Sequence, residues 1–154
     1  MLDASTLEIS IEAPTHDDSR TLIEDSNRSL AKHYSKEECF SFSAEELSAP
    51  NVEFFVARRG GRPVGCVALV DHLTYGEVKR LFVAEAARGV GVGAALMAAL
   101  EDAARDIGLR AIRLETGDRL AAAMAIYTAR GYRERGAFGG YPDLPTNTFL
   151  EKIL

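Results

Sequence analysis

Three glycines stand within residues 89–93, directly after Arg88 and directly before the apolar run 94–100. Glycine has no Cβ, so the backbone N–H groups of such a turn can approach a ligand closely. The run 94–100 consists of strong helix formers, and a helix N-terminus presents unpaired N–H donors and the positive end of its dipole. Arg88 adds a permanent cation. This spacing predicts an anion site, and the ligand that we expect there is a pyrophosphate.

The same stretch resembles the acetyl-CoA motif of the Gcn5-related N-acetyltransferase (GNAT) superfamily. In that motif, Arg or Gln is followed by two residues of any type, a Gly, one further residue, and a Gly or Ala, after a bulged strand. Arg88, Gly91 and Gly93 fill the three fixed positions. Further motifs of the superfamily follow in the same order, so that the resemblance extends from Glu77 to Tyr132.

The resemblance implies both a fold and an activity. The fold would be one α/β (α+β) domain over residues 1–154, with about four helices around a mixed sheet of six to seven strands, mostly antiparallel with one splayed parallel pair. The activity would be direct transfer of an acetyl group from acetyl-CoA to a primary amine, without a metal. Beside Arg88, the residues expected to hold the cosubstrate through their backbone are Phe82, Val83, Gly89, Val90, Gly91, Val92, Gly93 and Ala94.

Acetyl transfer to an amine poses two proton problems. An alkyl ammonium with a pKa of about 10.4 is deprotonated in only about one molecule in 2,500 at pH 7, so a general base helps. Glu77 stands where some GNAT relatives carry that base, although it could equally be a surface residue at the start of a strand. Tyr127 matches the family's tyrosine that protonates the leaving thiolate, as a phenol with a pKa near 10 can. Core packing is the alternative role for Tyr127.

Two other functions compete with catalysis. Gly89, Gly91 and Ala94 also fit a dinucleotide-binding fingerprint, with Glu115 near the position of its ribose-binding acid. A dinucleotide-binding turn normally follows its strand almost at once and opens its domain. Here residues 84–87 separate the strand from the turn, and a large part of the fold precedes it. Too little chain follows Glu115 to complete a doubly wound sheet. The second alternative is a domain that binds acetyl-CoA as a sensor without catalysis, a role that would need no proton donor.

Hydrophobic periodicity predicts the elements that position these residues. Strands are expected at 7–11, in a hairpin at 52–58 and 63–70 with its turn at 59–62, and at 76–83. Helices are expected from Thr15 or His16 to about 32, with Thr15 as the cap, and over 35–47 as one or two pieces, with Ser43 and Glu46 forming a capping box. Later elements are a helix at 94–106, a strand at 111–115 parallel to 78–83, a helix at 120–130, and strands at 132–136 and 148–153.

Composition bounds the remaining possibilities. The 154 residues are 47% hydrophobic and 27% charged, which suits one globular domain. The net charge of −5 argues against nucleic acid as a partner. No apolar run reaches the length of a membrane span and no secretory leader opens the chain, so we expect a cytoplasmic protein, with Cys39 and Cys66 reduced. A homodimer is compatible with the sequence.

The sequence does not name the acceptor amine, but Lys79 and Arg80 bear on it. Side chains alternate along a strand, so these two should leave opposite faces and at least one should point to a covered face. A covered cation needs an anionic partner. That partner would be an internal acid such as Glu115 or, failing that, a carboxylate of the substrate. We therefore expect a small, amino-acid-like amine as the acceptor, with a peptide or protein amine as the second choice.

Overall fold

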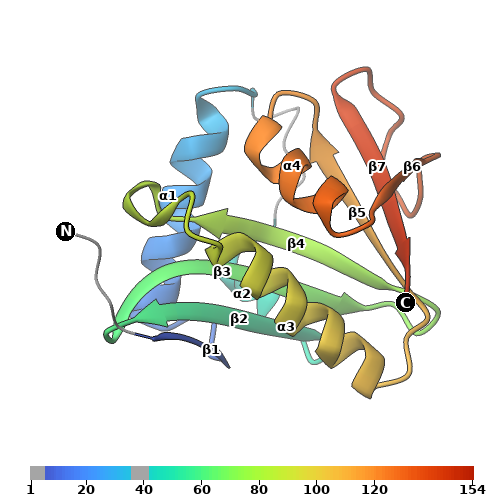
Figure 1. The fold of residues 1–154 in the computed structure, drawn as a ribbon. Coiled ribbons are helices and arrows are strands. Elements are labelled where there is room, and N and C mark those ends of the chain that lie inside the picture. Colours follow the sequence, from blue (N-terminus) through green and yellow to red (C-terminus); the bar gives the residue numbers. More distant parts are fainter. Residues whose placement is uncertain (1–5, 36–41) are drawn as a thin grey trace.

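Seven strands form one mixed sheet in the computed structural model, which describes residues 6–35 and 42–154 (Figure 1). Their order across the sheet is β1-β2-β3-β4-β5-β7-β6. Neighbouring strands are antiparallel except for β4 and β5, which are parallel. The strands are β1 (Leu7–Ile11), β2 (Val52–Arg59), β3 (Arg62–Asp71), β4 (Gly76–Val83), β5 (Ala111–Gly117), β6 (Arg133–Arg135) and β7 (Asn147–Ile153).

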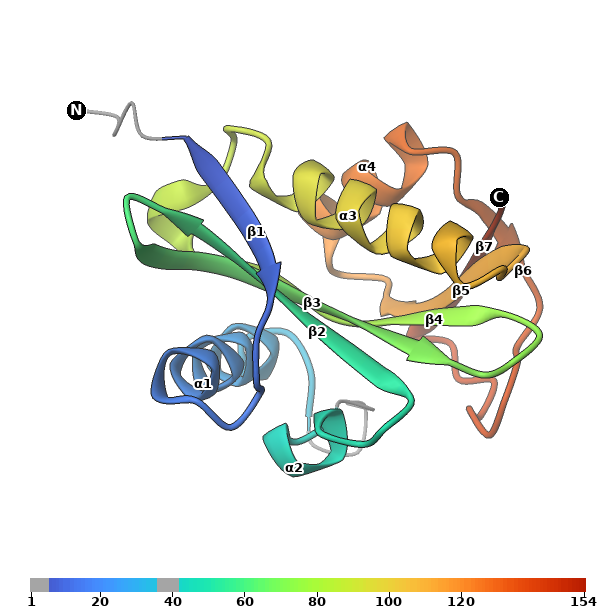
Figure 2. The same cartoon turned by 90° about the horizontal axis from the view of Figure 1, so that it is seen from below.

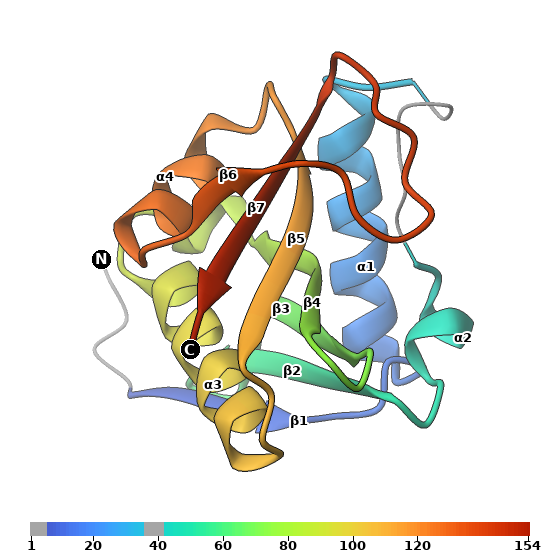
Figure 3. The same ribbon diagram turned by 90° about the vertical axis from the view of Figure 1, so that its right-hand side faces the viewer.

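Helices cover both faces of this sheet, as Figures 2 and 3 show from two directions. One face carries α1 and α2, and the other carries α3 and α4. The 3-10 helix η2 connects β4 to the glycine turn. The helices are α1 (Asp17–Ala31), α2 (Ala44–Leu47), η2 (Glu85–Ala87), α3 (Val92–Asp106) and α4 (Ala121–Ala129).

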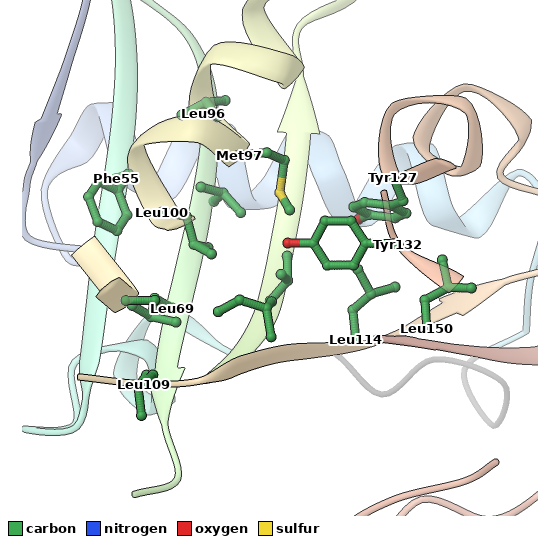
Figure 4. Packing of buried hydrophobic residues seen from close by; sticks show 14 of the residues in the cluster. Phe55, Leu69, Leu96, Met97, Leu100, Leu109, Leu114, Tyr127, Tyr132 and Leu150 are labelled. Carbon is green, nitrogen blue, oxygen red and sulfur yellow. The ribbon is translucent and has the colours of Figure 1, made fainter. Parts of the chain in front are cut away.

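Alternation along the central strands builds a separate apolar core on each face. Phe54 and Val56 of β2 pack with α1 and α2, whereas Phe55 and Ala57 belong to the core beneath α3. Figure 4 shows the second core, in which Tyr127 lies beside Tyr132. Because side chains of a strand alternate between faces, one continuous apolar run can serve both cores.

The predicted fold and the order of its elements are confirmed, with local corrections. The first helix begins at Asp17 with His16 as its N-cap, and no side chain caps it, so the cap predicted at Thr15 is wrong. The capping box of Ser43 and Glu46 is present at α2. The rest of the predicted second helix, with Cys39, lies outside the described residues. Helix α3 begins at Val92, two residues before its predicted start.

The parallel pair separates early. Pairing between β4 and β5 joins Gly76–Val78 to Ile112–Leu114 and stops there, so the predicted parallel, splayed pair is confirmed. In Figure 1 the two strands lie together at one end and diverge towards α4. A bulge in β4 accompanies this divergence, since Cys66 and Ala68 of β3 face Phe82 and Lys79. The stretch from Lys79 to Phe82 on β4 therefore contains one residue more than the stretch of β3 that it pairs with.

A buried ionic cluster ties α3 to the elements that carry Tyr127. The carboxylate of Glu101 has no exposed surface. It lies 2.8 Å from Nη2 of Arg130, the residue after α4, and 2.8 Å from Nζ of Lys152 in β7. Tyr132 donates a hydrogen bond to it over 3.0 Å. Burial alone would raise the pKa of Glu101, but these three hydrogen bonds outweigh burial and hold that pKa below its ordinary value. The cluster therefore fixes α4 against α3.

Candidate active site

The glycine turn has the backbone geometry that its sequence predicts. Gly89 and Gly91 have φ values of 81° and 88°, a region that residues with a Cβ rarely adopt. Gly91 is the N-cap of α3, so the free N–H groups at the start of that helix lie directly after the turn. This end of α3 also carries the positive end of the helix dipole, which favours an anion.

A cleft of about 570 Å³ lies beside this turn, between the end of β4, the N-terminal part of α4 and α1. All but one of the predicted cosubstrate residues line it. The exception is Val90, which is 38% exposed and whose side chain is outside the lining, although its amide belongs to the same turn. The lining residues from the prediction are Phe82, Val83, Arg88, Gly89, Gly91, Val92, Gly93 and Ala94.

Arg88 is held in place at the mouth of this cleft. Its Nε donates a hydrogen bond to the carbonyl oxygen of Val83 over 2.9 Å, and its guanidinium lies 5.8 Å from the centre of the Phe82 ring. The side chain is exposed, so its charge is available to a solvent-facing phosphate.

A second, smaller cavity of about 110 Å³ occupies the space where β4 and β5 diverge. It shares five lining residues with the larger cleft and so adjoins it directly. We call it the reaction cavity. Its lining includes Tyr34 after α1, Lys79 and Arg80 of β4, Glu115 of β5 and Tyr127 of α4.

Tyr127 combines burial with access to the reaction cavity. It is 5% exposed, and burial raises the pKa of its phenol above the ordinary value, with the charge of nearby Glu115 adding to the effect. The phenol is therefore protonated at neutral pH. Within residues 6–35 and 42–154 its hydroxyl makes no hydrogen bond, so core packing does not supply it with a partner there.

Glu115 is a residue of the cavity to which the sequence assigned no catalytic role. Burial raises the pKa of its carboxyl to about 7; the Lys79 ammonium opposes this effect and the Glu77 carboxylate adds to it. A carboxyl that titrates near neutral pH suits a general base. Its position twelve residues before Tyr127 was visible, but nothing in the sequence indicated that both face one cavity.

Glu77, the predicted base, lies outside the lining of the reaction cavity. It is 4% exposed and has polar partners on several sides. Its carboxylate is 2.8 Å from His72 Nε2 and 3.5 Å from Lys79 Nζ, and it accepts a hydrogen bond from Tyr141. Lys79 also donates to the Tyr141 hydroxyl. Glu77 thus connects to the cavity through Lys79.

The expected divergence of Lys79 and Arg80 is wrong. Arg80 has a φ of 59°, rare for a residue other than glycine, and it is the extra residue of the β4 bulge. Both side chains consequently reach Phe42: the Lys79 ammonium lies 5.0 Å from its ring centre and Arg80 Nε donates to its carbonyl oxygen over 2.9 Å. Lys79 is covered, as predicted, but the acid in contact with it is Glu77, whereas Glu115 acts on it only through its charge.

Tyr34 closes one side of the reaction cavity by contacting the loop between β5 and α4. Its hydroxyl donates to Asp118 Oδ1 over 3.1 Å and accepts a hydrogen bond from the Arg119 amide. The Arg119 guanidinium lies 5.2 Å from the Tyr34 ring centre and donates to the carbonyl oxygen of His33. We call this set of contacts the Tyr34 clasp.

A strand bulge, a splayed parallel pair and a glycine turn at the start of α3 are together the features of a CoA-dependent acetyltransferase fold. Comparison with known proteins agrees: residues 18–132 match the model of the acetyltransferase (GNAT) family. The chain therefore belongs to the GNAT family, whose members are acyltransferases, and it is an acetyltransferase by class.

Relatives match the chain over nearly its whole length. The IAA acetyltransferase of Azospirillum brasilense is 41% identical over 148 residues, which cover 95% of this chain and 97% of that protein. A Klebsiella pneumoniae protein, provisionally named an acyl-CoA N-acyltransferase, has a structure with a TM-score of 0.82 and 33% identity, over 97% of this chain and 98% of the other. The PaiA N-acetyltransferase of Thermoplasma acidophilum, solved with coenzyme A, shares the fold, with a TM-score of 0.76 at 18% identity over 97% and 99% of the two chains.

Residues 6–35 and 42–154 contain no group of three or more His, Cys, Asp or Glu side chains arranged to hold a metal ion. Within the same residues, every helix is too short or too polar to cross a membrane.

Proposed function

We propose that this chain is an acetyl-CoA-dependent N-acetyltransferase that acetylates the primary amine of a small, amino-acid-like metabolite by direct transfer. The observation that carries the proposal is the junction of two cavities. The cleft at the glycine turn suits a pyrophosphate, and it adjoins a cavity lined by Tyr127 and Glu115. A proton donor and a proton acceptor thus lie where a thioester bound in the cleft would end.

In this proposal acetyl-CoA occupies the larger cleft. Its pyrophosphate binds the amides of the turn and the start of α3, and Arg88 neutralises part of its charge. The pantetheine arm pairs with the backbone of Phe82 and Val83, where β4 has left its parallel neighbour. The open edge of a splayed strand has unpaired N–H and C=O groups, which suit the amides of pantetheine.

Transfer then needs one bond made and one broken. The amine nitrogen attacks the acetyl carbonyl carbon, the carbon–sulfur bond breaks, and the amide product keeps the acetyl group. Tyr127 donates its phenolic proton to the departing thiolate and later regains one from solvent. General acid catalysis of this kind contributes about 10²- to 10⁴-fold to the rate.

Glu115 is our proposed acceptor for the proton that the amine loses. It lines the cavity, and its pKa of about 7 leaves a large fraction ionised at neutral pH. Glu77 is the alternative base, and it would have to act through Lys79, which contacts Glu77 and lines the cavity. The pH dependence of Glu115→Gln and Glu77→Gln separates these two roles.

The cations of the reaction cavity support an acceptor that carries a carboxylate as well as an amine. Lys79 and Arg80 line the cavity together with Glu115, so an amino-acid-like molecule in it would meet groups of both charges. A purely cationic acceptor would instead bring its charges against these two side chains. Charge complementarity of this kind favours one substrate class over another.

An acceptor screen tests the proposal. Thiol release from acetyl-CoA is measured with amino acids, polyamines, aminoglycosides, peptides and IAA, the compound for which the Azospirillum brasilense relative is named. We expect the highest kcat/KM with an amine that bears a carboxylate. Turnover of a polyamine or aminoglycoside alone would refute the proposal that the acceptor carries a carboxylate. Tight acetyl-CoA binding without turnover of any amine would favour a domain that senses acetyl-CoA.

A further inference from the structure

Tyr34 forms one wall of the reaction cavity and is held there by the Tyr34 clasp. Tyr34 is 8% exposed, and its hydroxyl joins it to Asp118 and to the amide of Arg119. A side chain held at its far end by a donor and an acceptor has little freedom to rotate away. The ring therefore forms a rigid boundary, in contrast to a wall made of flexible aliphatic side chains.

Gly117 allows this wall to lie close against β5. A Cβ added at Gly117 would stand 2.2 Å from the Tyr34 hydroxyl oxygen and 2.3 Å from Cζ, distances at which one of the two groups must move. The absence of a side chain at the end of β5 thus admits the phenol into the space between β5 and α1. Tyr34 and Gly117 together close the cavity on the side next to Glu115 and Thr116.

The volume of the cavity limits what can fit inside this wall. Its 110 Å³ must hold the acyl group beyond the sulfur together with the amine and the carboxylate of the acceptor. This volume is about one fifth of the 570 Å³ of the adjoining cleft, so the reaction cavity is the narrow end of the combined space. Each further methylene of a longer acyl chain would displace the acceptor or press against Tyr34.

We propose that Tyr34 sets the acyl-chain length of this enzyme by closing the reaction cavity, so that acetyl-CoA is used in preference to propionyl-CoA and butyryl-CoA. The inference rests on the proposed function, because it places the acyl group of the cosubstrate in the reaction cavity. Tyr34 selects by exclusion, because its ring fills the space that a longer acyl chain would need. A pocket that differs by one methylene discriminates by about 10- to 200-fold.

The test compares kcat/KM for acetyl-, propionyl- and butyryl-CoA with the best acceptor of the screen. In Tyr34→Ala the wall is removed, and we expect the ratio of butyryl-CoA to acetyl-CoA to rise by about 10-fold or more. Tyr34→Phe is the matched control, since it removes the hydroxyl but keeps the ring in the cavity. We expect its ratio to change by less than about threefold, in accord with the steric origin of the preference.

Two further measurements keep the inference open to refutation. If Tyr34→Ala does not fold, as judged by thermal melting, Tyr34→Leu retains apolar packing with a shorter side chain and should shift the ratio in the same direction. An unchanged ratio in a folded variant that still uses acetyl-CoA overturns the inference and leaves the proposed function standing. If the wild type turns over no acyl-CoA, the proposed function fails, and calorimetry then decides: the affinity for butyryl-CoA relative to acetyl-CoA must still rise in Tyr34→Ala.

Discussion

The two adjoining cavities are built in different ways. The cleft at the glycine turn owes its anion site to the backbone of seven consecutive residues, 88–94, whose side chains are mostly small. The reaction cavity is made by side chains from α1, β4, β5 and α4, which are far apart in the chain. A substitution should therefore damage the first through backbone geometry and the second through the loss of a functional group.

Gly91→Asp should give the largest effect, because it damages the backbone site in two ways. An Asp side chain strains a residue with a φ of 88° and brings a negative charge to the phosphates. Calorimetry should show CoA affinity reduced on the order of 100-fold or more, a loss of about 2.7 kcal/mol or more of binding free energy.

Gly108→Asp is the matched control for this substitution. Gly108 has a φ of 85° and open space around it, but it follows the C-terminal end of α3. The same backbone strain should lower stability there and leave CoA affinity intact. Unchanged CoA affinity in folded Gly91→Asp would contradict the assignment of the glycine turn as the pyrophosphate site. A preference of the wild type for NAD over CoA would instead favour a dinucleotide site.

Tyr127→Phe should affect the side-chain cavity alone. We expect acetyl-CoA affinity to stay within about threefold, while kcat falls by about 10- to 1,000-fold, because the variant loses only the proton donor. Tyr132→Phe serves as the control. The Tyr132 hydroxyl donates a buried hydrogen bond to Glu101, so its loss should lower the melting temperature and leave kcat unchanged. A Tyr127→Phe enzyme with wild-type turnover would mean that Tyr127 is a packing residue.

Glu115→Gln and Glu77→Gln should separate the two candidate bases by their pH profiles. With Glu115 as base, wild-type kcat/KM rises with pH as a group of pKa about 7 ionises, and Glu115→Gln loses this rise. Its deficit should shrink at high pH, where the free amine is abundant. Glu77→Gln should cost a similar factor at every pH, because Glu77 orders Lys79 and Tyr141. The reverse pattern would make Glu77 the base.

The smallest effect that we predict is on stability. The pKa of Glu115 is raised to about 7 in the folded chain from its ordinary value of about 4.5, so the native state binds more protons than the unfolded state between these pH values. The free energy of unfolding therefore falls as pH rises from 4.5 to above 7. Glu115→Gln lacks this penalty, and its melting temperature relative to wild type should rise by a few degrees between pH 5 and pH 8. A difference that is constant with pH would contradict the raised pKa.

The sequence predicted the features that depend on neighbouring residues. The glycine turn, the hairpin turn of Gly60 and Gly61, and the capping box at α2 each follow from local backbone preferences, and all three are present. Hydrophobic periodicity predicted the succession of strands and helices, because each element must turn one apolar face to a core. Family motifs in their order then indicated the fold as a whole.

Only the tertiary structure decided the make-up of the reaction cavity. The bulge at Arg80 brings two consecutive cations to one side of β4, which strict alternation forbids. Burial beside Glu77 gives Glu115 a pKa near 7, and the close fit of Tyr34 over Gly117 closes the cavity. Each of these features depends on residues that meet across 30 or more positions of chain or on one extra residue in a strand register. Local conformational preferences do not predict such long-range contacts, because the packing of the whole sheet and its helices determines them.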